Sequence, residues 1–256
     1  MASTSELNST NTNKNSVSET GHAKNIANFQ DLISFVTGYG ATYNPNKNTL
    51  KLPQLTAVYT ASQSSLADVI TKKTAYNNKV NERVAAFKDL KSLATRLINA
   101  LQTTDATSEK IADAKAFNKK MQGIRAKAVE IPTDPNAPPP NTISTSQQSY
   151  DQQIQHLAGI ISVLQTEPSY APNETDLQIA TLIAKQANLT AKNSEVATAY
   201  TNISNSRISR DTTIYGTDTG LFDIATEVKK YIKSVYGTTS PQFAQVKGIE
   251  FTKKRR

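Results

Sequence analysis

The two histidines are the first side chains to test for chemistry, because imidazole acts as a metal ligand and as a general acid or base. Di-metal helical bundles typically place Glu-x-x-His pairs on two facing helices. That spacing occurs at Glu19 and His22, where Gly21 interrupts it. His156 lies near Asp151, and we interpret these two as a surface or rim pair, not a catalytic dyad. The histidines therefore predict no metal site.

No other motif in the chain is typical of an enzyme. A glycine-rich phosphate-binding loop followed by Lys and Ser or Thr is absent, and so is a Gly-x-Ser-x-Gly motif. The lack of cysteine excludes disulfides and thiolate chemistry. We therefore expect no catalytic residue, no metal ligand and no cofactor, and we predict that the protein is not an enzyme.

The positive charge is concentrated at the C-terminal end. Of the net charge of +8, four units come from the tail, and the remaining 25 Lys and Arg residues stand against 21 acidic residues. A terminal basic run attracts phosphates or anionic lipids, although most such runs are simply solvated. The tail is a candidate anion-binding site, with weak nucleic-acid binding as its consequence: Lys253, Lys254, Arg255 and Arg256.

No segment is long and apolar enough to predict a membrane span. The strongest apolar stretch, 157–164, has eight residues, whereas a helix needs roughly 20 to cross a bilayer. Residues 1–20 contain no apolar run, so we expect neither a signal peptide nor an anchor, and hence a cytoplasmic location. The Ser, Thr and Asn content of 1–22 predicts a disordered tail.

The elements that must position these residues follow a sequence repeat. Residues 43–46, Tyr-Asn-Pro-Asn, recur 127 positions later as Tyr-Ala-Pro-Asn at 170–173, and apolar positions match at the same offset. A repeated unit usually buries its apolar face against its neighbour; chance similarity between two amphipathic helices is the alternative. The predicted organisation is a helical repeat at 23–129, a proline-rich linker at 130–146, a second repeat at 147–252 that packs with the first as one bundle, and a basic tail at 253–256.

Each repeat contains a long helix. Apolar residues recur at spacings of three and four after Pro53, which predicts a coiled-coil-like helix from Pro53 to Leu101 and a counterpart over 174–215. The turn Gly216–Gly220 should end the second long helix. The fold class is therefore all-α, an elongated helical bundle built from two tandem sequence-related halves. Shorter helices are expected at 108–125, 147–166 and 221–236, with a short turn after Ser240.

Two arginines interrupt the apolar stripes at matched positions. Arg83 and Arg210 lie 127 residues apart. As a polar core pair, they would line a central site and bind an acidic group. The favoured interpretation is that each extends past the bundle edge or pairs with a nearby acid on another helix.

Three parts of the chain resemble a known family. The segments 21–29, 37–45 and 236–249 resemble a family of uncharacterised helical proteins from Bacteroidota-type bacteria. The resemblance covers most of residues 21–252. It implies a bacterial protein that belongs to the family along its whole chain, and it supplies no activity, cofactor or catalytic residue.

The sequence favours a non-enzymatic helical scaffold that interacts with a protein partner or with itself. A membrane-acting helical protein resembling bundle-type pore formers, with 157–164 as an apolar tongue, is the first alternative. Weak nucleic-acid binding through the basic tail is the second.

Overall fold

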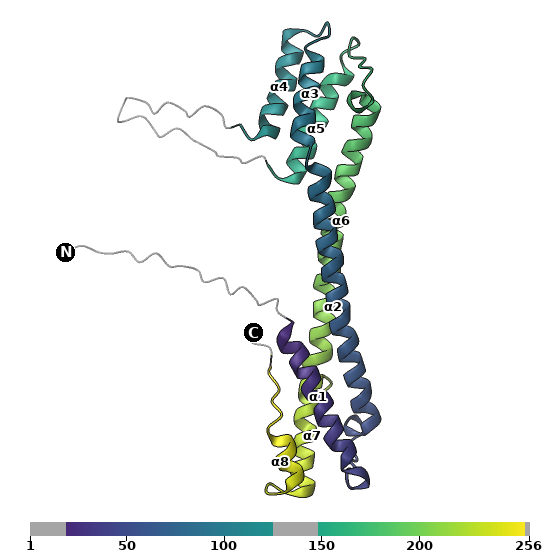
Figure 1. Ribbon diagram of the computed structural model, residues 1–256, viewed down its shortest axis with the longest axis vertical. Helices are drawn as coiled ribbons and strands as arrows, with labels where there is room; N and C mark the ends of the chain where they lie inside the picture. Colours follow the sequence, from purple (N-terminus) through teal and green to yellow (C-terminus); the bar gives the residue numbers. More distant parts are fainter. Residues whose placement is uncertain (1–18, 125–147, 254–256) are drawn as a thin grey trace, which may run out of the picture. The chain divides into compact units, whose positions relative to one another are not determined.

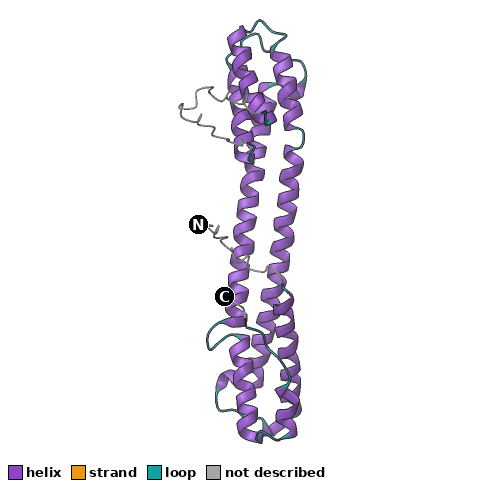
Figure 2. Ribbon diagram, turned by 90° about the vertical axis from the view of Figure 1, so that its left-hand side faces the viewer, coloured by secondary structure: helices purple, strands orange, loops and turns teal. Residues whose placement is uncertain are grey.

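The computed structural model describes residues 19–124 and 148–253. These residues are helical and contain no strand (Figure 2), which confirms the all-α prediction. The 3-10 turns Asn48–Leu50 and Thr175–Leu177 precede the two longest helices. The helices, labelled in Figure 1, are α1 (Thr20–Gly38), α2 (Leu52–Phe87), α3 (Leu90–Leu101), α4 (Ser108–Gln122), α5 (Tyr150–Gln165), α6 (Ile179–Tyr215), α7 (Leu221–Tyr236) and α8 (Pro241–Lys247).

Several predicted helix ends are fixed by local capping chemistry. Thr107, Ser149 and Ser240 each accept a hydrogen bond from the backbone N–H three residues later, at the starts of α4, α5 and α8. Gly123 ends α4 with a φ of 78°, a left-handed conformation that glycine adopts at little cost. The Gly216–Gly220 turn separates α6 from α7, as predicted.

The single helix predicted from Pro53 to Leu101 is wrong. The structure has two helices, because the chain turns at Lys88 and Asp89 before α3 begins. No glycine or proline marks this break. In the predicted repeat it is aligned with the Gly216–Gly220 turn, and it lets α3 pack on α4 and α5. Packing therefore ends α2.

The predicted disordered tail is also wrong at its C-terminal end, because α1 begins at Thr20 and includes His22. Residues 1–18 of that tail lie outside the described residues, as does the linker predicted at 130–146.

Two compact units divide the chain, and each draws on both sequence halves. Unit 1 takes residues up to 71 and from 204 onward, whereas unit 2 comprises 72–203. Unit 1 contains α1, the start of α2, the end of α6, α7 and α8. Unit 2 contains the end of α2, α3, α4, α5 and the start of α6 (Figure 1). The predicted repeats divide the sequence, but they do not coincide with these units.

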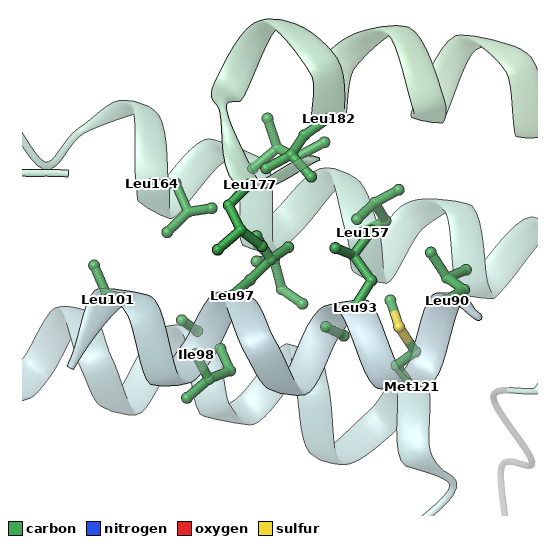
Figure 3. Packing of buried hydrophobic residues seen from close by; sticks show 14 of the residues in the cluster. Leu90, Leu93, Leu97, Ile98, Leu101, Met121, Leu157, Leu164, Leu177 and Leu182 are labelled. Carbon is green, nitrogen blue, oxygen red and sulfur yellow. The ribbon is translucent and has the colours of Figure 1, made fainter. Parts of the chain in front are cut away.

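Leucine-rich faces of α3 and α5 meet in unit 2 with an apolar face of α4 that buries Ala114 and Met121. The segment 157–164 is the core-facing part of α5, so the stretch considered as an apolar tongue is packed inside the unit. Figure 3 shows these buried side chains, which include Leu90, Leu97 and Leu101 of α3, Met121 of α4, and Leu157 and Leu164 of α5.

Charged side chains join the two long helices within unit 2. Lys79 on α2 lies 3.0 Å from Glu195 on α6, and Lys192 on α6 lies 2.7 Å from Glu82 on α2. These reciprocal ion pairs fix which turns of the two helices face each other. The coiled-coil geometry predicted for them stays a prediction.

An apolar core holds α1, α7 and α8 together in unit 1. The buried residues of this core recur every three or four positions along each helix, which is the spacing of an amphipathic helix. The buried side chains include Phe29, Leu32 and Val36 of α1, Leu55 of α2, Ile224, Val228 and Ile232 of α7, and Val246 of α8.

The same local structure occurs in both units. The Tyr43 hydroxyl donates to the carbonyl of Leu50 at 2.7 Å, and the Tyr170 hydroxyl donates to the carbonyl of Leu177 at 2.9 Å. Both tyrosines are buried and come from the repeated Tyr-x-Pro-Asn motif. In each unit this bond fixes the loop and the 3-10 turn that lead into a long helix.

Candidate functional site

A depression of about 450 Å³ lies on unit 1, where α7, α8 and the segment 249–253 that follows α8 meet. We call it the basic pocket. Most of its wall comes from lysine and phenylalanine side chains, and the main lining residues are Phe222, Lys229, Lys230, Lys233, Phe243, Lys247, Ile249 and Phe251.

Aromatic rings from three separate segments form the apolar part of the pocket. Phe222 comes from α7, Phe243 from α8 and Phe251 from the C-terminal segment. Phe243 and Phe251 also pack against the core of unit 1, so this wall is anchored to the fold. All three rings are half-buried, so part of their apolar surface remains open to the pocket.

Ammonium groups surround these rings. The Lys233 Nζ lies 6.0 Å from the centre of the Phe243 ring, and the Lys253 Nζ lies 5.8 Å from that of Phe222. Lys230 and Lys247 add two further cations to the lining, in which Glu250 is the acidic residue. Positive charge next to exposed apolar surface favours ligands that are anionic and partly apolar.

Lys229 stabilises the wall of the pocket by binding backbone carbonyl groups. Its ammonium group donates to the carbonyl of Lys247 at 3.1 Å and to that of Ile249 at 2.9 Å. It thereby satisfies carbonyl groups at and after the C-terminus of α8, where helices leave acceptors unpaired. Burial lowers the pKa of Lys229, because a low-dielectric environment disfavours the ammonium form.

The C-terminal wall of the pocket is attached to α1 by two asparagines. Asn25 donates to the carbonyl of Thr252 at 2.8 Å and accepts from the Thr252 N–H at 2.9 Å. Asn28 donates to the carbonyl of Glu250 at 2.5 Å. Because backbone groups of 249–253 are held from both α1 and α7, the pocket is preformed.

The corresponding part of unit 2 is packed differently. Phe117 on α4 is aligned with Phe243 in the predicted repeat, and its ring lies against Gly159 on α5. A Cβ at Gly159 would lie 2.5 Å from that ring, so the close approach requires glycine. Phe243 therefore lines a pocket in unit 1, whereas Phe117 packs between two helices in unit 2.

The two arginines predicted as a polar core pair belong to different units, and each has partners within its own unit, although the buried Nε of Arg83 has no hydrogen-bond partner among the described residues. Arg210 pairs with Glu19 and with Asp211. Arg83 donates to Asn193 at 2.9 Å, and its guanidinium lies 4.0 Å from the centre of the Tyr150 ring. The interpretation that each arginine pairs locally fits Arg210, whereas Arg83 pairs with an amide and a ring.

Of the predicted anion-binding tail, the structure describes Lys253, which stands beside the basic pocket. Lys254, Arg255 and Arg256 lie outside the described residues. Net charge gave no sign of the pocket, because an excess of positive charge is evident only in the tail. Residues 221–252 carry four Lys against three Asp and Glu, so the pocket is basic because folding brings its lysines together and not because α7 and α8 hold a large excess of charge.

The histidines occupy structural positions. His22 on α1 shares a 2.9 Å hydrogen bond with the Tyr215 hydroxyl on α6. His156 is buried in α5, so the surface or rim position predicted for it is wrong, and Asp151 accepts a hydrogen bond from Asn193. Within residues 19–124 and 148–253, no group of three or more His, Asp or Glu side chains is placed to hold a metal ion.

Comparison of the chain with protein-family models, with curated proteins and with solved structures finds no match in any of the three. Among the described helices, none combines the length and the apolar character needed to cross a membrane.

Proposed function

We propose that this protein is a non-enzymatic helical scaffold that binds an acidic protein partner through the basic pocket. The observation that carries the proposal is the convergence of lysine ammonium groups and phenylalanine rings from α7, α8 and residues 249–253 on one depression. Binding surfaces typically combine an apolar centre with a charged rim. Charge at the rim steers the partner, and apolar contact retains it.

A protein partner fits this surface better than a nucleic acid does. The described cations around the pocket are lysines, which act as point charges, whereas arginine is the side chain that matches phosphate by a bidentate contact. Sequence-tolerant binding of single strands needs aromatic platforms in succession along a groove. Here the rings surround one depression.

We also infer that the two sequence halves arose from a tandem duplication. The paired Tyr43 and Tyr170 hydrogen bonds support this inference. So does the equivalent helix packing, since α3 contacts α4 and α5 while α7 contacts α8 and α1. The different surroundings of Phe117 and Phe243 then result from divergence of the two copies, and the copy that contains Phe243 has the pocket used for binding.

The test is capture from an extract of the native host with a photo-crosslinker at Thr226, inside the pocket. We expect crosslinking to an acidic protein, and we expect Lys230→Glu with Lys233→Glu to abolish it. Lys119→Glu with Lys120→Glu makes the same charge change near the ring of Phe117, on α4, and serves as the matched control. Crosslinks that survive the α7 change, or that are lost equally in both variants, would refute the proposal.

A further inference from the structure

The geometry of the basic pocket points to a more specific partner: an acidic linear peptide segment that inserts one large apolar side chain between Phe222, Phe243 and Phe251. Its carboxylates on either side of that anchor pair with the lysines at the rim. This inference rests on the proposed function and adds the chemistry of the partner.

The size and walls of the pocket specify the anchor. A volume of about 450 Å³ lies toward the lower end of the roughly 300–1,000 Å³ found for ligand pockets. That space admits one large side chain with parts of its neighbours. Because rings from three segments face it, an aromatic or long aliphatic side chain gains contact on several sides.

The arrangement of the lysines specifies the flanking residues. Lys230 and Lys233 are three positions apart on α7 and therefore lie on the same helix face. Lys247 stands on α8, and Lys253 approaches from the C-terminal segment. Cations thus lie on more than one side of the apolar centre, so acidic residues both before and after the anchor find a partner.

The walls of the pocket are fixed before any partner binds. Lys229 holds the end of α8 and residue Ile249, while Asn25 holds Thr252 from α1. A preformed site pays little ordering entropy on binding, so a short segment can bind measurably by itself. This makes isolated peptides suitable probes.

The experiment measures fluorescence anisotropy of labelled synthetic peptides with the full chain. Two peptides rich in Glu and Asp differ only at a central position, which is Phe in one and Ala in the other. We expect the Phe peptide to bind about tenfold more tightly, as partial burial of a phenylalanine side chain predicts. Added salt should weaken both peptides, because rim charges are screened.

Variants of the protein separate the two parts of the inference. Lys230→Glu with Lys233→Glu should weaken both peptides by about tenfold or more, whereas Lys119→Glu with Lys120→Glu should leave both within about twofold. Phe222→Ala should remove most of the preference for the Phe peptide. Phe222 is chosen because Phe243 and Phe251 also pack against the core. Circular dichroism of each variant verifies that it is folded.

The outcomes distinguish the inference from the proposed function. Equal binding of the Phe and Ala peptides would overturn the inference that the partner inserts an apolar side chain. The proposed function is tested separately, by the crosslinking experiment. Failure of both peptides to bind would overturn the linear-segment partner. Tighter, Lys230- and Lys233-dependent binding of a single-stranded oligonucleotide or of phosphatidylserine vesicles would assign the pocket to nucleic acid or membrane instead.

Discussion

The side chain of Asn25 forms a reciprocal pair of hydrogen bonds with the backbone of Thr252, 227 residues later in the chain. Asn25 is 1% exposed, and its amide also donates to the Tyr215 hydroxyl at 3.3 Å. The reciprocal pair holds the next-to-last described residue, Thr252, on the first helix. The C-terminal wall of the basic pocket therefore depends on α1.

Asn25→Ala should release this wall. Loss of the two hydrogen bonds to Thr252 and of the one to the Tyr215 hydroxyl, all at a buried position, is expected to lower the free energy of unfolding by about 1–3 kcal/mol. Hydrogen exchange should increase selectively in residues 249–253. Urea unfolding combined with exchange mass spectrometry measures both effects.

Asn28→Ala is the control for this prediction. Asn28 is half-buried, but its hydrogen bond to the carbonyl of Glu250 is open to solvent, so its loss should cost no more than about 0.5 kcal/mol. If the two variants behave alike, the special part assigned to Asn25 is wrong.

The tyrosines of the repeated motif should contribute equally to stability. Tyr43→Phe and Tyr170→Phe each remove one hydroxyl and leave a buried carbonyl group, of Leu50 or Leu177, without its donor. We expect a loss of about 0.5–1.5 kcal/mol in each case. Because the sites lie in different units and share no partner, the double variant should show additive losses in urea titration. Clearly unequal losses would argue against structural equivalence of the motifs.

Glu167 should make the free energy of unfolding depend on pH below about 4.5. Its carboxylate accepts from the Ser169 hydroxyl and from the Lys110 ammonium, which lowers its pKa from 4.5 to about 2. A lowered pKa in the folded state means that the contribution is present above about pH 4.5 and is lost as the pH falls through about 2. Glu167→Gln should therefore lower the urea midpoint at pH 7 but make a shrinking difference below pH 4.

The same substitution at the exposed Glu174 controls for the removal of one negative charge. A difference between the wild type and Glu167→Gln that persists unchanged to pH 2 would contradict the assigned hydrogen-bonded carboxylate.

Gly159→Ala should destabilise unit 2 although alanine is the better helix former. The helix preference favours alanine by about 1 kcal/mol, but the added Cβ meets the Phe117 ring at 2.5 Å. Forcing that ring away from α5 is expected to produce a net loss of about 1–3 kcal/mol, measured by thermal unfolding. Phe117→Leu in the same chain should recover part of the loss.

Gly21→Ala provides the matched comparison, because Gly21 lies in α1 and nothing stands within 4 Å of its added Cβ. It should be neutral or slightly stabilising. A Gly159→Ala variant that also gains stability would show that the ring yields at no cost.

Local sequence signals explain much of the helical framework. The spacing of apolar residues predicted the all-α class, and the helices expected at 108 and after Ser240 begin there because Thr107 and Ser240 cap the first turn. The helix expected from 147 begins at Tyr150, where Ser149 is the cap. The Gly216–Gly220 turn was visible because glycines tolerate the conformations that end a helix. These features depend on residues close together in the chain, so the sequence alone is sufficient for them.

Contacts between distant segments decided the rest. The break at Lys88 and Asp89 has no glycine or proline, and it follows from the packing of α3 on α4 and α5. The division into units that mix both sequence halves depends on which long-helix segments meet. A periodic stripe predicts that a helix will be covered, but it does not identify the element that covers it.

The candidate site shows the same distinction. Composition located positive charge near the C-terminus, and Lys253 is indeed beside the pocket. Nothing in the linear order indicates that Phe222, Phe243 and Phe251 share one depression, or that Asn25 supports its wall. Local periodicity determined most of the helices, and composition determined the excess of positive charge. Only tertiary packing, which joins residues far apart in the chain, brought the lysine and phenylalanine side chains together into a pocket.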